Sequence, residues 1–421
     1  MTSARVPNAV PTRLRRARLG VALLFFTNAL AYANLVPRLP EVRVDLGLSY
    51  TQFGVAIAMM PVGALVLGLT AGALIRRFHS ANVGTWGMVL LALSVVLAGL
   101  APTGVLFAAA LFLAGALDSI ADVAQNSHGL RVQREYGRSI LNGMHGIWSI
   151  GAVAGGLMGG AAAGLGLDLG VHLAVVAVIV ATVNIVGHRW LLPGADPRAD
   201  VEAGGHDAHG SPADAPASAG ASAPRRRRGP LGAASGGTWL VLLALGAIAM
   251  SGTWVEDAGA TWAASYLRDE LGTGATLAAL GFVSLQGMQF IGRIAGDAMV
   301  DRWGQRAVAR AGAVIGLVGM GSALAFPTVW GTILGFGAAG FGVATLIPSA
   351  MAVADDLPGF KHGAALTYLG WLLRASFLVS PPLVGFIADS VSIRAGLMLM
   401  PVSAVVVLLL AGVLAPRVRA R

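Results

Sequence analysis

The sequence predicts an all-α integral membrane protein with twelve transmembrane helices in two six-helix, pseudo-symmetric bundles. The observations behind this prediction are the composition, the number of long apolar runs and a similarity between the two halves of the chain. Hydrophobic residues make up 56% of the 421 residues and charged residues 12%, and the mean hydropathy is +0.73. A soluble protein has about 25% charged residues. The lipid bilayer is therefore the predicted solvent.

Twelve apolar runs are each long enough for a membrane-spanning helix, which needs about 20 residues. They cover residues 19–37, 52–75, 83–100, 105–130, 140–165, 171–190, 239–267, 275–300, 307–326, 329–354, 364–388 and 393–415. These runs predict an N-terminal bundle over 19–192 and a C-terminal bundle over 238–415, with short tails at 1–18 and 416–421.

The basic residues predict the orientation of these spans. Of the 29 Lys and Arg residues, four fall in loops on one side of the predicted membrane and two fall within spans. The other 23 lie on the side that carries the termini. Because loops rich in Lys and Arg stay in the cytoplasm, we expect both termini to be cytoplasmic and the protein to be a multi-pass protein of a bacterial inner membrane. The arginines occur in short clusters between apolar runs, so the net charge of +9 does not indicate nucleic-acid binding.

The segment 193–237 separates the two bundles. It is rich in Ala, Gly, Ser, Pro and Asp and contains the run Arg225–Arg228. Such a segment cannot bury a core, so we expect a disordered cytoplasmic linker whose basic run contacts anionic lipid.

The two halves resemble each other. The stretch RRFHSANV at 76–83 aligns with DRWGQRAV at 301–308, and each stretch follows the second span of its own half. Weak repetition between six-span halves is typical of transporters with parallel repeats, whose substrate site lies near mid-membrane between the halves.

Polar side chains are concentrated in a few spans, where their cost favours positions facing a protein interior or an aqueous cavity. Residues three or four apart share a helix face, and the faces defined in this way predict one central chamber. The expected proton-coupling residues are Asp118, Asp122, Glu256, Asp257, His128 and His145. The expected substrate-binding residues are Asn28, Tyr32, Asn126, Trp148, Trp254, Gln286, Gln289, Trp371 and Arg374. The alternative is that these groups form hydrogen bonds that only hold the helices together.

Asp118 and Asp122 lie one turn apart in the fourth span. A low dielectric and a like-charged neighbour both disfavour ionisation, so at least one of these acids is expected to carry a proton near neutral pH. His128 and His145 can relay this proton, and Arg374 can hold one acid ionised. In the alternative interpretation, Asp122, with Asn126, only hydrogen-bonds neighbouring helices as a buried brace. Glu256 and Asp257 are the next candidates for proton coupling.

Two further patterns concern packing and energy. The fifth span contains GAVAGGLMGG at 151–160, whose small residues allow close approach of another helix. No Walker sequence or catalytic motif occurs, so neither ATP nor a cofactor is expected to drive the protein, and no enzyme activity is expected.

These features resemble the major facilitator superfamily over the whole chain. The loop signature of that family, G-x-x-x-D-R-x-G-R-R, matches at Gly72 and Arg77, but Arg76 and His79 replace its acid and its second glycine. In relatives these loops form a cytoplasmic gate by pairing charges. The resemblance implies a cytoplasmic gate at the residues Arg77, Glu135, Arg138, Asp301 and Arg302.

A finer resemblance joins three stretches to the MosC/YbjJ-like branch of this superfamily: DVAQNSH at 122–128, EYGRSILNGMHGIWSIG at 135–151 and PRLPEVRVDLGLS at 37–49. It implies a proton-coupled transporter of a small polar solute such as a sugar, polyol or amino sugar. We separately expect a monomer with no metal or cofactor. The glycine-rich fifth span also resembles the antiporter motif of drug exporters, so export of amphipathic compounds is an alternative. A membrane sensor or a membrane enzyme on the same fold are further alternatives.

Overall fold

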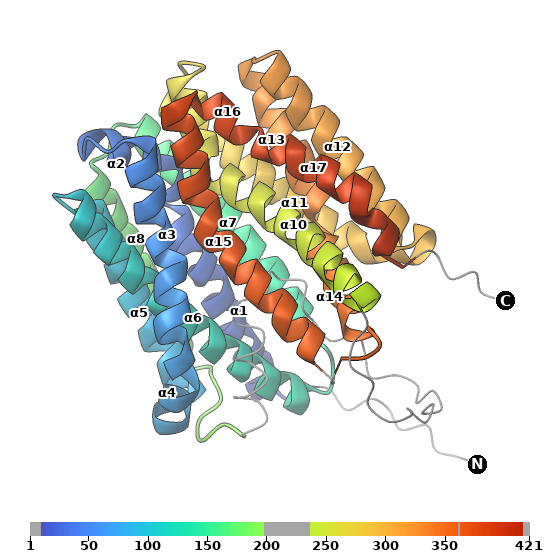
Figure 1. Cartoon of the computed structure of the whole chain (residues 1–421). Coiled ribbons are helices and arrows are strands. Elements are labelled where there is room, and N and C mark those ends of the chain that lie inside the picture. The colour runs from blue at the N-terminus through green and yellow to red at the C-terminus, as the bar shows by residue number, and fades with distance from the viewer. Residues whose placement is uncertain (1–9, 198–235, 361–362, 416–421) are drawn as a thin grey trace.

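The computed structural model describes residues 10–197, 236–360 and 363–415, and these residues form helices joined by short turns without any strand among them. Twelve of the helical segments are long and apolar enough to cross a membrane. The predicted number of spans is therefore confirmed for the described part of the chain. Figure 1 shows the N-terminal half in blue to green beside the C-terminal half in yellow to red.

The first half contains six spans, some of them built from more than one helix. Its elements are α1 (Thr12–Ala33), η1 (Val36–Arg38), α2 (Leu39–Asp45), α3 (Tyr50–Leu67), η2 (Gly68–Thr70), α4 (Ala71–Phe78), α5 (Ser80–Gly99), α6 (Gly104–Tyr136), α7 (Leu141–Gly164) and α8 (Leu169–His188). The second half follows the same order. Its elements are α10 (Gly236–Asp269), α11 (Ala275–Trp303), α12 (Gln305–Ala325), α13 (Val329–Val343), α14 (Leu346–Asp355), α15 (Ala364–Ser390), α16 (Ile393–Leu397), α17 (Leu399–Leu410) and η3 (Ala411–Val413).

The bundle has two ends, which we name by the elements found there. The terminal side is the end at which α1 begins and where α4 and α14 lie, toward the bottom of Figure 1. The far side is the opposite end, where α2 and α16 lie, toward the top of Figure 1.

The helix starts show the relation between the halves in atomic detail. Thr103 caps α6, and Thr328, at the equivalent position of the second half, caps α13 through the same side-chain oxygen. In the same way, His79 precedes α5 with φ 71° and ψ 148°, and Gly304 precedes α12 with φ 83° and ψ 153°. His79 is the only described residue other than glycine with a positive φ. The two loops therefore have one backbone shape, although only the second keeps the glycine that this shape favours.

Helix α7 is the small-residue helix that the sequence predicts, and it uses two faces. Gly151, Gly155 and Gly159 lie against the backbone of α1 in the same half. Gly156 and Gly160 lie against α11 in the other half, where Phe282 and Ala279 occupy the space of the missing side chains. The glycines therefore let α7 approach one helix of each half closely, which places α1, α7 and α11 around the centre of the molecule.

Several boundaries differ from the sequence-based expectation, and two of them lie at the ends of the first half. Helix α1 begins at Thr12 instead of residue 19, because Leu14 and Ala17 are buried on one face while the arginines between them remain exposed. The first residues of the expected linker, 193–197, are described and lie against the first half. The remaining linker residues 198–235, which include Arg225–Arg228, and the tail 416–421 lie outside the described residues.

Candidate functional site

The acid of α6 is held by a hydrogen-bonded chain across three helices. Trp148 Nε1 of α7 donates to Asn28 Oδ1 of α1 at 2.8 Å, and Asn28 Nδ2 donates to Asp118 Oδ1 of α6 at 2.7 Å. Asn28 is 5% exposed. Because the indole can only donate and the carboxylate oxygen accepts, the amide of Asn28 has one possible orientation. The sequence predicted all three residues for the site, and the structure brings them together.

Tyr32 connects this chain to the other half of the molecule. It lies one turn beyond Asn28 on α1, and its side chain is close enough to Asp118 and to Asp257 of α10 to interact electrostatically with both. Asp118 belongs to the first half and Asp257 to the second. Tyr32 is therefore near one carboxyl group of each half.

A second polar group lies within the C-terminal half. Gln289 Nε2 donates to Glu256 Oε2 at 2.8 Å, and Arg293 Nη2 lies 3.5 Å from the same oxygen. Asp257 is adjacent in sequence and feels the charge of Glu256. Its Oδ2 is buried and makes no hydrogen bond with a described residue, although the Ser380 hydroxyl lies beside the carboxyl group. Asp257 thus has an oxygen available for a ligand or a proton.

Asp122 has a hydrogen-bond partner on its own helix. Gln125 Nε2 donates to Asp122 Oδ1 at 2.7 Å, whereas both polar atoms of Asn126 are buried and make no hydrogen bond with a described residue. The three-residue spacing brings the glutamine side chain back to the carboxylate. The alternative interpretation, in which Asp122 and Asn126 brace neighbouring helices, therefore has no described partner for Asn126 and stays a prediction for Asp122.

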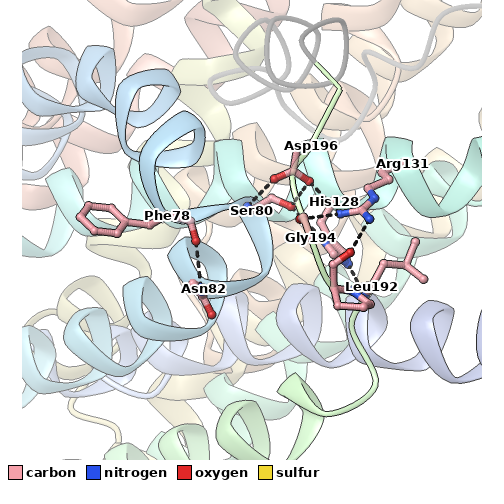
Figure 2. Close-up of polar contacts among 9 residues, drawn as sticks. Phe78, Ser80, Asn82, His128, Arg131, Leu192, Gly194 and Asp196 are labelled. Carbon is pink, nitrogen blue, oxygen red and sulfur yellow. Dashed lines mark hydrogen bonds and ion pairs between the residues drawn. The ribbon is translucent and has the colours of Figure 1, made fainter.

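The two histidines occupy separate environments. His145 packs edge-on against Phe25, with ring centroids 5.1 Å apart, and is close enough to Arg293 to interact electrostatically. His128 lies at the terminal side in the network of Figure 2. There its Nε2 accepts from the Leu192 backbone N–H at 3.1 Å, and its Nδ1 lies 2.7 Å from Ser80 Oγ.

The network in Figure 2 attaches the segment after α8 to the first half. Asp196 accepts from the Ser80 backbone N–H at the start of α5 at 2.6 Å, and Arg131 donates to the carbonyls of Pro193 and Gly194. Both ring nitrogens of His128 are used in this network, so the structure does not bring His128 to the acids of α6. A proton-relay role for His128 remains a prediction that this arrangement does not favour.

The remaining predicted ligands lie on α10, α11 and α15 of the C-terminal half. The Arg374 guanidinium lies over the Trp371 ring, 5.5 Å from its centroid, and makes no ion pair with a described acid. Trp371 is 59% exposed. Trp254 Nε1 is buried and makes no hydrogen bond with a described residue, and Gln286 is also buried. Buried polar atoms without partners call for an explanation, and a polar ligand supplies one.

The predicted gate residues lie in the loops of the terminal side. All five are exposed, and none makes an ion pair with another described residue. They are Arg77, Glu135, Arg138, Asp301 and Arg302. Among the residues that the structure describes, charge pairing between these gate residues therefore does not close the terminal side.

Polar contacts between the halves occur instead at the far side, and the sequence reasoning did not find them. Arg43 Nη2 of α2 donates to Asp269 Oδ2 of α10 at 3.0 Å, and the Tyr50 hydroxyl donates to the same oxygen at 2.8 Å. Asp389 of α15 accepts from the backbone N–H groups of Tyr50 and Thr51 at 2.9 and 2.8 Å. The sequence signal here is limited to the start of α3, which the capping box of Ser49 and Gln52 fixes; it does not indicate the contacts with the other half.

The two halves, their twelve spans and the polar groups between them define the class of the protein as a membrane transporter with two helical bundles. The comparisons name the family. The model of the Major Facilitator Superfamily matches residues 21–297 and 257–421. The chain belongs to this superfamily and is a multi-pass membrane transporter.

Curated relatives and solved structures agree with this assignment. The chain is 27% identical to "Uncharacterized transporter y4wD" of Sinorhizobium fredii over 395 residues, 94% of this chain and 97% of that protein. It is 26% identical to "Membrane protein MosC" of Rhizobium meliloti over 393 residues, 92% of this chain and 87% of that protein, as the predicted branch implied. The fold resembles a bacterial homologue of the human lysosomal transporter Spinster, with a TM-score of 0.67, 12% identity and coverage of 96% and 98%. It also resembles the nucleoside transporter NupG, with a TM-score of 0.66, 13% identity and coverage of 94% and 97%.

Proposed function

We propose that this transporter moves a small polar organic solute, such as a sugar, polyol or amino sugar, across the bacterial inner membrane by alternating access coupled to protons. The observation that carries the proposal is the chain from Trp148 through Asn28 to Asp118, with Tyr32 near both that acid and Asp257. It joins an aromatic ring, an amide, a hydroxyl and two carboxyl groups at the interface of the halves.

Each of these groups suits one part of the proposed task. Aromatic rings offer flat apolar faces to a ring-shaped solute, and amide and hydroxyl groups form hydrogen bonds with the polar edge of such a solute. A carboxyl group inside a membrane binds or releases a proton according to whether its surroundings stabilise the charge. Asp118 is the proposed proton carrier because its hydrogen bond reaches the solute-binding residue Asn28 directly.

Solute binding can therefore change the proton affinity of Asp118. A solute that takes the Asn28 amide as a hydrogen-bond partner competes with the 2.7 Å bond to Asp118. Loss of that bond removes a donor that stabilises the ionised carboxylate, so the carboxylate takes up a proton. Solute and proton then occupy the interface together, which is the requirement for cotransport.

We further propose that the terminal side faces the cytoplasm, since 23 of the 29 Lys and Arg residues belong to that side. Activity reporters fused after Arg228 and after Arg421 should then both behave as cytoplasmic. A periplasmic signal at either position would exclude this orientation.

Transport in proteoliposomes tests the proposed function. Purified protein is reconstituted with an entrapped pH-sensitive dye, and sugars, polyols, amino sugars and amphipathic drugs are added one at a time. The proposal predicts that at least one small polar solute moves protons across the membrane. The matched control is Asp45→Asn, which removes an exposed far-side carboxylate and should leave this proton movement unchanged. Proton movement with amphipathic drugs alone would contradict the proposed solute class.

A further inference from the structure

The far side of the molecule contains contacts between the halves that the proposed transport cycle has to break. They involve Arg43, Tyr50, Asp269 and Asp389, to which we refer together as the far-side latch. We infer that Asp389 is the gating residue of this transporter, because its carboxylate holds the far side closed by binding the start of α3.

The geometry of Asp389 is the first reason to assign it this role. Its two oxygens accept from two successive backbone N–H groups of α3, at 2.9 Å from Tyr50 and 2.8 Å from Thr51. The first N–H groups of a helix have no partner within the helix, and the helix dipole adds positive charge at this end. The acid on α15 thus supplies the charge and the acceptors that α3 lacks, although α15 belongs to the other half of the molecule.

Tyr50 joins Asp389 to the ion pair of the latch. The Tyr50 ring has the Arg43 guanidinium 4.2 Å from its centroid, and its hydroxyl donates to Asp269. The Tyr50 ring also lies 5.9 Å from that of Trp262 on α10. One residue at the start of α3 therefore contacts both α10 and α15 of the opposite half, so the contacts must be made and broken together.

The backbones of α3 and α15 also approach each other closely beside Asp389. A Cβ atom at Gly54 would overlap the Pro381 carbonyl, and one at Gly385 would overlap the Tyr50 carbonyl. These two glycines therefore allow the two helices to touch next to Asp389. Opening the far side by rocking one half against the other has to separate this contact and the Asp389 hydrogen bonds in the same movement.

The two sides of the molecule differ in how their charged residues are paired. The terminal-side gate residues are exposed and make no ion pair with another described residue. In the first-half loop, Arg76 stands where the family signature has an acid. Within the described ranges, the polar contacts that join the two halves therefore involve the far-side latch and not these gate residues, and the latch sets the resting state. This inference rests on the alternating access that we propose above.

Distances between spin labels test the inference without any knowledge of the solute. The chain has no cysteine, so pairs can be introduced directly. Val105→Cys with Trp330→Cys labels the far side, where both residues are exposed and lie at equivalent helix starts of the two halves. Phe78→Cys with Trp303→Cys labels the terminal side at another pair of exposed, equivalent positions. Double electron–electron resonance then gives the distance within each pair.

Asp389→Ala should increase the far-open population about tenfold or more, because it removes two charge-assisted hydrogen bonds to backbone amides. The far-side distance should lengthen while the terminal-side distance shortens. Asp269→Ala should have the same effect as Asp389→Ala: a longer far-side distance and a shorter terminal-side distance. The double variant Arg43→Asp with Asp269→Arg, which exchanges the two charges, should restore both distances. Asp45→Ala, which removes an exposed far-side acid outside the latch, should change neither distance.

Three results separate the interpretations. Opposite changes of the two distances support the latch. Lengthening of the far-side distance alone would mean that Asp389 only stabilises local structure, and unchanged distances in both Asp389→Ala and Asp269→Ala would also overturn the inference. If Asp389→Ala does not yield folded protein, Asp389→Asn keeps one acceptor and should give a smaller change of the same sign. Failure of solute-driven proton movement with intact distance changes would instead count against the proposed function.

Discussion

Replacement of His79 by glycine should stabilise the transporter. His79 has φ 71° and ψ 148°, a conformation that residues with a side chain rarely adopt, and its side chain makes no hydrogen bond with a described residue. Such a backbone costs on the order of 1–3 kcal/mol. Glycine removes this strain but gains freedom in the unfolded chain worth about 0.5–1 kcal/mol. The difference predicts a net stabilisation of about 1 kcal/mol.

The two repeats provide an internal control for this prediction. Gly304 has nearly the same backbone angles, φ 83° and ψ 153°, in the second half. His79→Gly should raise the midpoint of thermal unfolding, and Gly304→His should lower it, because the second change introduces the strain that the first removes. The nine tryptophans allow both to be followed by intrinsic fluorescence in detergent. A lower midpoint for His79→Gly would refute the strain argument.

Three further substitutions test the helix contacts and the candidate site. Gly160→Leu should destabilise the protein by about 1–3 kcal/mol through overpacking against α11. Gly143→Leu is the control, because no atom lies within 4 Å of the added Cβ. It should lower the free energy of unfolding less than Gly160→Leu in the same assay. Trp371→Ala should weaken solute binding in a titration of folded protein. Its control is Trp330→Ala, which removes a similarly exposed tryptophan on the far side and should leave the affinity for the solute unchanged. Equal affinity for the solute in the two variants would mean that Trp371 only packs. Asn28→Ala removes a hydrogen bond to Asp118 worth about 1.5–3 kcal/mol if that acid is charged. The variant should therefore show less solute-driven proton movement. Unchanged proton movement would exclude Asn28 as the link between the solute and Asp118.

The sequence was sufficient to predict the fold because each span is recognisable by its length and composition. The repeat was visible in the loops that follow the second span of each half, and the structure places equivalent helix caps at Thr103 and Thr328. The glycine pattern of α7 correctly indicated close helix contacts. It did not show that alternate glycines face different halves, because a pattern of small residues does not identify the partner helix.

The sequence predicted the candidate site in part. Helical spacing identified Asn28 and Asp118, since buried polar groups in a membrane need partners, but it could not show that the Asn28 amide bridges Trp148 and Asp118. The far-side latch was missed because Arg43, Tyr50 and Asp389 lie at helix ends, where charged residues need no special explanation. His128 was predicted to relay a proton because the sequence does not reveal that Ser80 of α5 and Leu192 after α8 contact both of its ring nitrogens.

Proton-driven accumulation and solute exchange, measured separately in Asp118→Asn, test the proposed coupling most directly. Proteoliposomes with an imposed pH gradient measure proton-driven accumulation, and the same liposomes preloaded with solute measure exchange at equal pH. We predict that the variant loses accumulation to the level of protein-free liposomes and retains exchange, because asparagine keeps the shape of the aspartate but carries no titratable proton. Normal accumulation by Asp118→Asn would contradict the central claim that this acid couples the proton to the solute.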